Sequence, residues 1–330
     1  MLLPHRRKGR NIAHPDRTRF CDISKPRFEY PIRPMKTAFA VLLLLTAACR
    51  YEPPAGTIDG SSIQKDEDAW RAHRAERLKA PDSWLTLAGL YWLSDGNNDV
   101  SLPAKPPVPA QFVLQNGKVT LQPNPSLTIE GKPVTAPVVL HDDTESKPTV
   151  VRTGTLSFVA IRREEVTKGP RFGIRVRDTE ADARTNFKGL DYFPVNPNAR
   201  VEARFEPYNP PKKIPITNVL GMISNEISPG ALVFTLQGRE FRLDPILEQG
   251  EKDYFIIFKD ATSGKETYGA ARYMYAHPPD AHGKTIVDFN KSYNPPCAFT
   301  PYATCPLPPP QNRLPIRIEA GEKKYAGGHA

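Results

Sequence analysis

The polar side chains best suited to binding or acid–base chemistry lie mostly in the last third of the chain. The candidates are Arg177, Asp178, Asp260, Thr262, Tyr268, Arg272, Asp288, Asn290, Asn294, Asn312 and Glu322. An arginine such as Arg272 can bind an anionic group, and a carboxylate can serve as an acid or a base. If several of these residues converge, the sequence predicts one pocket around residues 260–322.

A structural interpretation of the same residues is also open. Short polar side chains cap turns, which is the expected role here for Asp288, Asn290 and Asn294. Arg272 can pair with Asp260 or Asp178 instead of binding a ligand. Spacing along the chain does not decide between these interpretations.

Catalytic signatures are missing from the chain, which has no G-x-S-x-G, H-E-x-x-H, P-loop, G-x-G-x-x-G or C-x-x-C motif. Their absence favours a domain that binds a small molecule or a partner protein. The alternative is a hydrolase-like enzyme that uses Asp260, Asp288 and Glu322 together with Arg272. No metal site and no cofactor is predicted.

Two cysteines, Cys297 and Cys305, stand in a proline-rich segment that is stiffened by its composition. In an oxidising compartment two nearby cysteines most often form a disulfide, and this is the first expectation. Two buried free thiols, a metal site and a catalytic thiol stay open. A metal site would need further ligands, and a nucleophilic thiol would need a base.

The elements that must position these residues are mainly strands. One helix is predicted over 62–79, where Gly and Pro are absent and Pro81 follows. After it, short apolar runs are separated by turn signals, and Asn116-Gly117 between two alternating runs predicts a β-hairpin. The other expected strands are 156–161, 174–176, 201–205, 232–236, 241–243, 255–258, 286–289 and 316–318.

This pattern predicts a mainly β fold, an antiparallel barrel or sandwich with one N-terminal helix and long Pro-rich loops. The globular domain is expected over residues 62–330. The Pro-rich segment 207–215 either separates two β subdomains or forms a long surface loop.

A segment close to the N-terminus predicts an export signal. Residues 35–48, MKTAFAVLLLLTAA, have a positive start, a short apolar run and small residues. The next residue is Cys49, and the string Leu45 to Cys49 resembles a bacterial lipobox, although Thr46 stands where Leu is usual. The sequence thus predicts lipidation of Cys49, a flexible tether over 49–61 and a lipid-anchored protein of the bacterial cell envelope that faces the periplasm.

Charge is uneven along the chain. Residues 1–34 contain nine Lys and Arg but three acidic residues, whereas the chain from Cys49 onward contains 35 basic and 33 acidic residues. A nearly neutral domain implies no nucleic-acid partner. The leader 1–34 is expected to be non-native or disordered, with Met35 as an alternative start to Met1.

Several motifs together resemble one bacterial family. They are W-L-T-L-A-G-L-Y-W-L (84–93), the block 260–272, D-F-N…Y-N-P-P-C-A…C-P-L-P-P (288–309) and the closing A-G-E-K. They are similar to the family of domain of unknown function 1684, over roughly residues 66–325. The resemblance implies no assigned activity. The expected function is therefore that of an envelope protein that binds an unknown small molecule or envelope protein.

Overall fold

The computed structural model describes residues 60–327 of the 330-residue chain. Helix α1 spans Gly60–Lys79, close to the helix predicted over 62–79. The predicted leader, signal peptide, lipidated Cys49 and most of the tether lie outside the described residues. No helix within residues 60–327 is long and apolar enough to cross a membrane.

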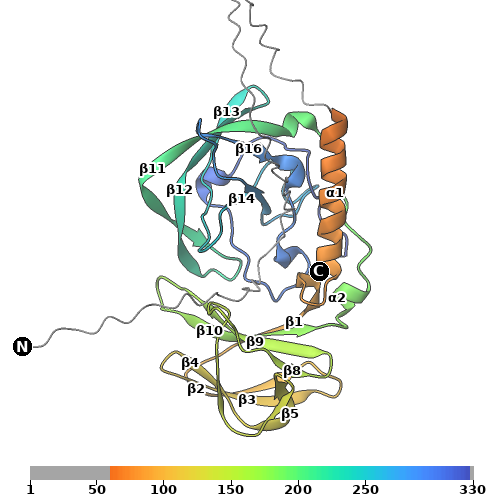
Figure 1. Cartoon of the computed structure of the whole chain (residues 1–330), viewed down its shortest axis with the longest axis vertical. Helices are drawn as coiled ribbons and strands as arrows, with labels where there is room; N and C mark the ends of the chain where they lie inside the picture. Colours follow the sequence, from red (N-terminus) through yellow and green to blue (C-terminus); the bar gives the residue numbers. More distant parts are fainter. Residues whose placement is uncertain (1–59, 328–330) are drawn as a thin grey trace, which may run out of the picture.

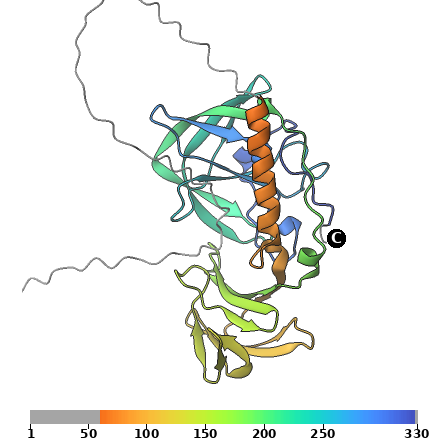
Figure 2. The ribbon, with the colours of Figure 1, turned by 45° about the vertical axis from the view of Figure 1, so that its right-hand side comes forward.

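Helix α1 lies along the C-terminal half of the molecule (Figures 1 and 2). The residues on its inner face are Ile63, Glu67, Trp70, Arg74 and Leu78, which recur at the spacing of one helix face. All are buried except the half-buried Trp70. This face therefore places an acid and a base among apolar side chains, so α1 docks partly through ionic contacts.

Residues 87–178 form the N-terminal lobe, a sandwich of two antiparallel sheets (Figure 1). One sheet has the order β1-β10-β9-β8-β5-β6 and the other β2-β3-β4-β7. The strands are β1 (Leu87–Trp92), β2 (Gly96–Leu102), β3 (Val108–Gln115), β4 (Lys118–Leu121), β5 (Asn124–Ile129), β6 (Lys132–Val134), β7 (Val138–Leu140), β8 (Val151–Thr153), β9 (Leu156–Arg163) and β10 (Arg171–Asp178). Phe112 and Phe158 meet edge to face between the sheets, at 5.8 Å between ring centroids.

Residues 200–320 form the C-terminal lobe, which α1 flanks (Figure 1). Its sheets have the orders β13-β12-β11-β16 and β14-β15. The strands are β11 (Arg200–Thr217), β12 (Ile223–Leu236), β13 (Arg239–Leu243), β14 (Tyr254–Phe258), β15 (Arg272–Ala276) and β16 (Lys284–Asp288). A connection that contains the short helix α2 (Asp182–Thr185) leads into this lobe from β10.

The prediction of a mainly β, antiparallel fold with one N-terminal helix is confirmed. The hairpin at Asn116-Gly117 is present between β3 and β4, and both turn residues have positive φ as a tight hairpin turn requires. The segment 207–215 is neither a boundary nor a free loop, because it lies within the bulged strand β11.

The strand predicted over 316–318 is wrong. Ile316 and Ile318 are buried in the core of the C-terminal lobe, as their apolar side chains suggest. Their backbone forms no ladder, however. The N–H of Ile318 donates to the carboxylate of Asp260 and its carbonyl accepts from Arg272. Side chains therefore satisfy backbone groups that a neighbouring strand would otherwise pair.

The two lobes pack together through a shared apolar cluster. It joins Leu87 of β1 to Ile214 of β11, Phe255 of β14 and Tyr273 of β15, with Trp84 partly buried against it. Trp84 begins the short 3-10 helix η1 (Trp84–Thr86), which connects α1 to β1. Residues from both lobes and from α1 thus meet at this junction.

Candidate functional site

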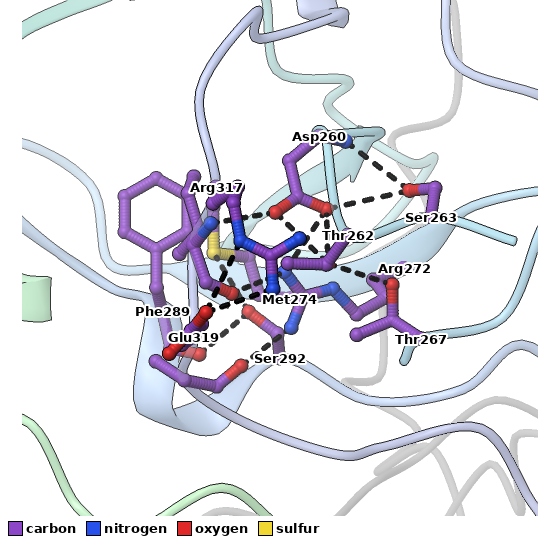
Figure 3. Close-up of polar contacts among 12 residues, drawn as sticks. Asp260, Thr262, Ser263, Thr267, Arg272, Met274, Phe289, Ser292, Arg317 and Glu319 are labelled. Atoms are coloured by element: carbon purple, nitrogen blue, oxygen red, sulfur yellow. Dashed lines mark hydrogen bonds and ion pairs between the residues drawn. The ribbon is translucent and has the colours of Figure 1, made fainter. Parts of the chain in front are cut away.

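Asp260 and Arg272, two of the predicted site residues, form a closed network inside the C-terminal lobe (Figure 3). Both are buried, and Arg272 Nη2 lies 3.3 Å from Asp260 Oδ1. Arg272 also donates to the carbonyls of Ile318, at 3.1 Å, and Ala320. Asp260 accepts from the hydroxyl of Thr262 at 2.8 Å. These contacts fix the C-terminal segment to strands β14 and β15, which is a structural role.

Glu322 is the partner of Arg74 on the inner face of α1. Its Oε1 lies 2.8 Å from Arg74 Nε, and its Oε2 accepts from the backbone N–H of Asn294 at 2.8 Å. Arg74 donates in turn to the carbonyl of Asn294 at 3.1 Å and covers the ring of Tyr293. A buried ion pair of this kind docks the helix onto the domain.

The remaining buried candidates hold backbone in place. Asp288 accepts from the N–H of Asn290 at 3.1 Å, and Asn290 donates to the carbonyl of Asn196 at 2.9 Å. Asn312 donates to the carbonyl of Asp244 and accepts from its N–H. Such contacts replace the hydrogen bonds that irregular backbone would otherwise lack.

Three further candidates, Arg177, Asp178 and Tyr268, are partly buried. The hydroxyl of Tyr268 donates to the carbonyl of Cys297 at 2.9 Å, and Asp178 accepts from the N–H of Glu180 at 2.9 Å. Arg177 lines the cavity described below. The structure therefore does not bring the predicted set into one pocket.

The cavity lies where α1, η1 and the two lobes meet, and its volume is about 210 Å³. Strands β9 and β10 contribute from the N-terminal lobe and strands β14 and β15 from the C-terminal lobe. The segment from Pro296 to Pro306 completes the wall. The sequence predicted a pocket around residues 260–322, and part of this region does border the cavity. The residues of this region that line the cavity are not the predicted pocket residues.

Five arginines line this cavity: Arg74, Arg77, Arg163, Arg175 and Arg177. Two have their own carboxylates, since Arg74 pairs with Glu322 and Arg77 with Asp82. On β9 and β10, Arg163 and Arg175 share one carboxylate, that of Asp143. It is 2.7 Å from Arg163 Nη2 and 4.0 Å from Arg175 Nη1. The wall formed by the N-terminal lobe is therefore cationic.

Arg175 is the most constrained of the arginines on β9 and β10. Its side chain is buried, and its Nε has no hydrogen-bond partner among the described residues. Burial, followed by the charge of Arg163, lowers the pKa of Arg175 to about 9, against the opposing effect of Asp143. The hydroxyl of Ser83, a buried residue before η1 that also lines the cavity, likewise has no hydrogen-bond partner among residues 60–327. Unpaired buried donors of this kind suit an anionic ligand.

The C-terminal lobe and η1 contribute aromatic side chains to the cavity. Phe255 lies 5.2 Å from Tyr275 and 5.0 Å from Tyr273, measured between ring centroids. The rings of Tyr275 and Tyr293 are nearly parallel, at 14° and 6.5 Å. Trp84 borders the same space. The cavity thus combines a cationic side with a ring-rich side.

One carboxylate, that of Glu248, lies on the aromatic side. The hydroxyl of Tyr275 donates to its Oε2 at 3.4 Å. Burial raises the pKa of Glu248, and Tyr275 opposes this shift.

Cys297 and Cys305 are both buried and are not bonded to each other in the structure. The N–H of Cys297 donates to the sulfur of Cys305 at 3.0 Å, so the pair is close, and Cys305 borders the cavity. Contact with Cys305 lowers the pKa of the Cys297 thiol, and burial raises that of Cys305. The disulfide stays a prediction. Among residues 60–327 no group of three or more His, Cys, Asp or Glu side chains is placed to hold a metal ion.

Comparisons with known proteins agree with the resemblance seen in the motifs. The family model described as "Protein of unknown function (DUF1684)" matches residues 185–323. A protein of Haloarcula marismortui, described as uncharacterized and solved in solution by NMR, is 31% identical. That match covers 42% of this chain and 78% of the other, with a TM-score of 0.37. Residues 185–323 of the chain therefore resemble the DUF1684 family.

No curated protein matches the chain. The DUF1684 match begins at residue 185, so the motif at 84–93 and the strands that carry Arg163, Arg175 and Arg177 precede it. The cavity is therefore built partly from the DUF1684 segment and partly from the lobe before it.

A local pattern marks the cationic wall, although it was not used to predict the site. In strand β10, R-F-G-I-R-V-R-D, apolar residues alternate with Arg171, Arg175 and Arg177. Phe172 and its apolar partners face the core of the N-terminal lobe, so the arginines must lie on the other face. Their proximity to α1 and to Tyr275 depends on tertiary structure, and no sequence pattern predicts it.

Proposed function

We propose that this protein binds a small anionic molecule in the cavity at the lobe junction. The observation that carries the proposal is that two buried groups on the cavity lining, Nε of Arg175 and the hydroxyl of Ser83, have no hydrogen-bond partner among residues 60–327. Removing a donor from water without a partner costs about 1–3 kcal/mol, and more for a charged group. A ligand oxygen at this position would offset that cost.

The charge of the cationic wall supports the same proposal. Arg163 and Arg175 come from adjacent antiparallel strands and share the carboxylate of Asp143. Close like charges in a partly desolvated site repel one another. A carboxylate or phosphate ligand would relieve this repulsion and would accept hydrogen bonds from the guanidinium groups in a fixed geometry.

The hydrolase-like alternative receives less support. It assigned the chemistry to Arg272 and to the carboxylates of Asp260, Asp288 and Glu322. Asp260 and Glu322 are buried in ion pairs with Arg272 and Arg74, and Asp288 caps the turn at Asn290. General acid–base catalysis requires a group within reach of a substrate, and none of the four lines the cavity.

The proposal extends to where the protein works. The signal-like segment 35–48 and the lipobox-like string that ends at Cys49 support export and lipid anchoring in the bacterial cell envelope. The globular domain would then bind its ligand on the periplasmic side. Localisation and ligand binding are separate parts of the proposal, and each has its own test.

Isothermal titration of the purified protein with sodium phosphate and with sodium acetate tests the binding proposal. Arg175→Gln and Ser83→Ala should each weaken binding, the former by roughly 10- to 100-fold because a charged hydrogen bond is lost. The matched control is Arg171→Gln, on the same strand but stacked on Trp92 outside the cavity, which should bind as the wild type does. Equal binding by all variants, or no binding by a folded wild type, would contradict the proposal.

A further inference from the structure

The shape and chemistry of the cavity restrict which anion it takes. A cavity of about 210 Å³ exceeds what a bare inorganic anion needs. An apolar cavity of about 150 Å³ holds benzene. The volume therefore accommodates one six-membered ring together with one anionic group.

The side that faces the ring position offers flat apolar surface. Phe255 contacts the rings of Tyr273 and Tyr275, and Tyr293 contacts the same two rings, with the planes of Tyr275 and Tyr293 differing by 14°. Aromatic faces pack well against a further planar ring, in offset-stacked or edge-to-face geometry. A ligand ring at this wall would continue the existing cluster.

Two hydroxyl groups on the aromatic side, those of Tyr273 and Tyr275, already form hydrogen bonds within the protein. The hydroxyl of Tyr273 donates to the carbonyl of Pro306 at 2.8 Å, and that of Tyr275 donates to Glu248. A ligand with many hydroxyl groups needs a matching set of donors and acceptors, because each unmatched polar group carries a desolvation penalty. The wall thus favours an apolar planar ring over a sugar.

We propose that the ligand is a small aromatic anion, in which one carboxylate or phosphate group is attached to a planar ring. The anionic group lies against Arg175 and Ser83, and the ring packs on Tyr275. This inference rests on the proposed anion binding and adds the chemical class of the ligand. Carboxylate and phosphate share the recognition chemistry, and the choice between them is left to the test.

The test is isothermal titration of the purified full-length protein with matched probes. Phenyl phosphate is compared with inorganic phosphate, benzoate with cyclohexanecarboxylate, and benzamide serves as the uncharged ring. Phenyl phosphate and benzoate should each bind roughly tenfold more tightly than their non-aromatic counterparts. Benzamide should bind least well, because it lacks the charge that Arg175 recognises. The tighter of the two aromatic anions identifies the preferred head group.

A variant separates the ring from the head group. Tyr275→Leu keeps apolar volume but removes the stacking face, so it should weaken phenyl phosphate and benzoate while leaving inorganic phosphate unchanged. The matched control is Tyr91→Leu in the N-terminal lobe, where the Tyr91 hydroxyl binds the carbonyl of Ser101 and the ring lies outside the cavity. Circular dichroism of each variant verifies that it is folded.

The outcomes distinguish the two proposals. If inorganic phosphate binds as tightly as phenyl phosphate, or if glucose 6-phosphate binds more tightly than phenyl phosphate, the aromatic class is wrong and anion binding stands. If none of the anions binds the folded wild type, both proposals fail. Equal loss of aromatic-anion affinity in Tyr275→Leu and Tyr91→Leu also overturns the assignment of the ring position.

Discussion

The Asp260–Arg272 pair allows a quantitative test of the structural role that the fold gives it. Arg272→Met keeps most of the side-chain volume but removes the cation 3.3 Å from Asp260 Oδ1. It also leaves the carbonyls of Ile318 and Ala320 without their donor. Breaking a buried ion pair by removing one partner costs about 3–5 kcal/mol. That is a large part of the roughly 5–15 kcal/mol by which a typical domain is stable.

The assay is urea unfolding followed by circular dichroism, with the free energy of unfolding extrapolated to water. The double variant Asp260→Asn with Arg272→Met should cost less than the sum of the single variants, by on the order of 2 kcal/mol, because the uncompensated charge is removed. The control is Arg204→Met, whose exposed pair with Glu206 should contribute less than about 1 kcal/mol. A cost for Arg272→Met below about 1 kcal/mol, or simple additivity in the double variant, would refute the structural role.

Two further predictions concern buried ionisable groups and the cysteines. Burial and the charge of Asp288 raise the pKa of Glu67 from 4.5 to about 7. Between these pH values the native state keeps a proton on Glu67 that the unfolded state loses. The free energy of unfolding therefore falls as pH rises from 4.5 to about 7. Glu67→Gln should therefore be more stabilising at pH 8 than at pH 5, by up to about 3 kcal/mol in unfolding free energy; an equal effect at both pH values would contradict this. Intact-mass analysis of the protein from bacterial membranes should show a diacylated Cys49. On reduction the mass should increase by two protons, because the Cys297–Cys305 disulfide opens. That disulfide should add about 2–3 kcal/mol to the free energy of unfolding. An unmodified N-terminus at Met1 would contradict the anchor, and an unchanged mass on reduction would contradict the disulfide.

The fold class could be predicted because local signals carry it. Alternating apolar residues in short runs define strands, and Asn116-Gly117 determines one hairpin turn through its positive φ values. The strand predicted at 316–318 failed for a physical reason. Burial alone does not distinguish a strand from irregular backbone whose hydrogen bonds are satisfied by the side chains of Asp260 and Arg272.

The site could be predicted only in part. Polar residues such as Asn312 and Glu322 drew attention by their type, but they fold inward to hold irregular backbone and helix α1. The cavity depends instead on contacts between distant parts of the chain, such as Arg175 of β10 with Thr304 near the C-terminus. Type and spacing along the sequence do not reveal such pairs, although the alternation in β10 marks a cationic face.

The central claim is that the lobe junction holds an aromatic anion, head group against Arg175 and ring against Tyr275. The most direct measurement is a crystal structure of the protein with 4-bromobenzoate, in which anomalous scattering locates the bromine. The account predicts a bromine peak within the cavity, on its aromatic side, with the carboxylate bound by Arg175 and Ser83. A fully occupied bromine site elsewhere, with the cavity holding water alone, would contradict it.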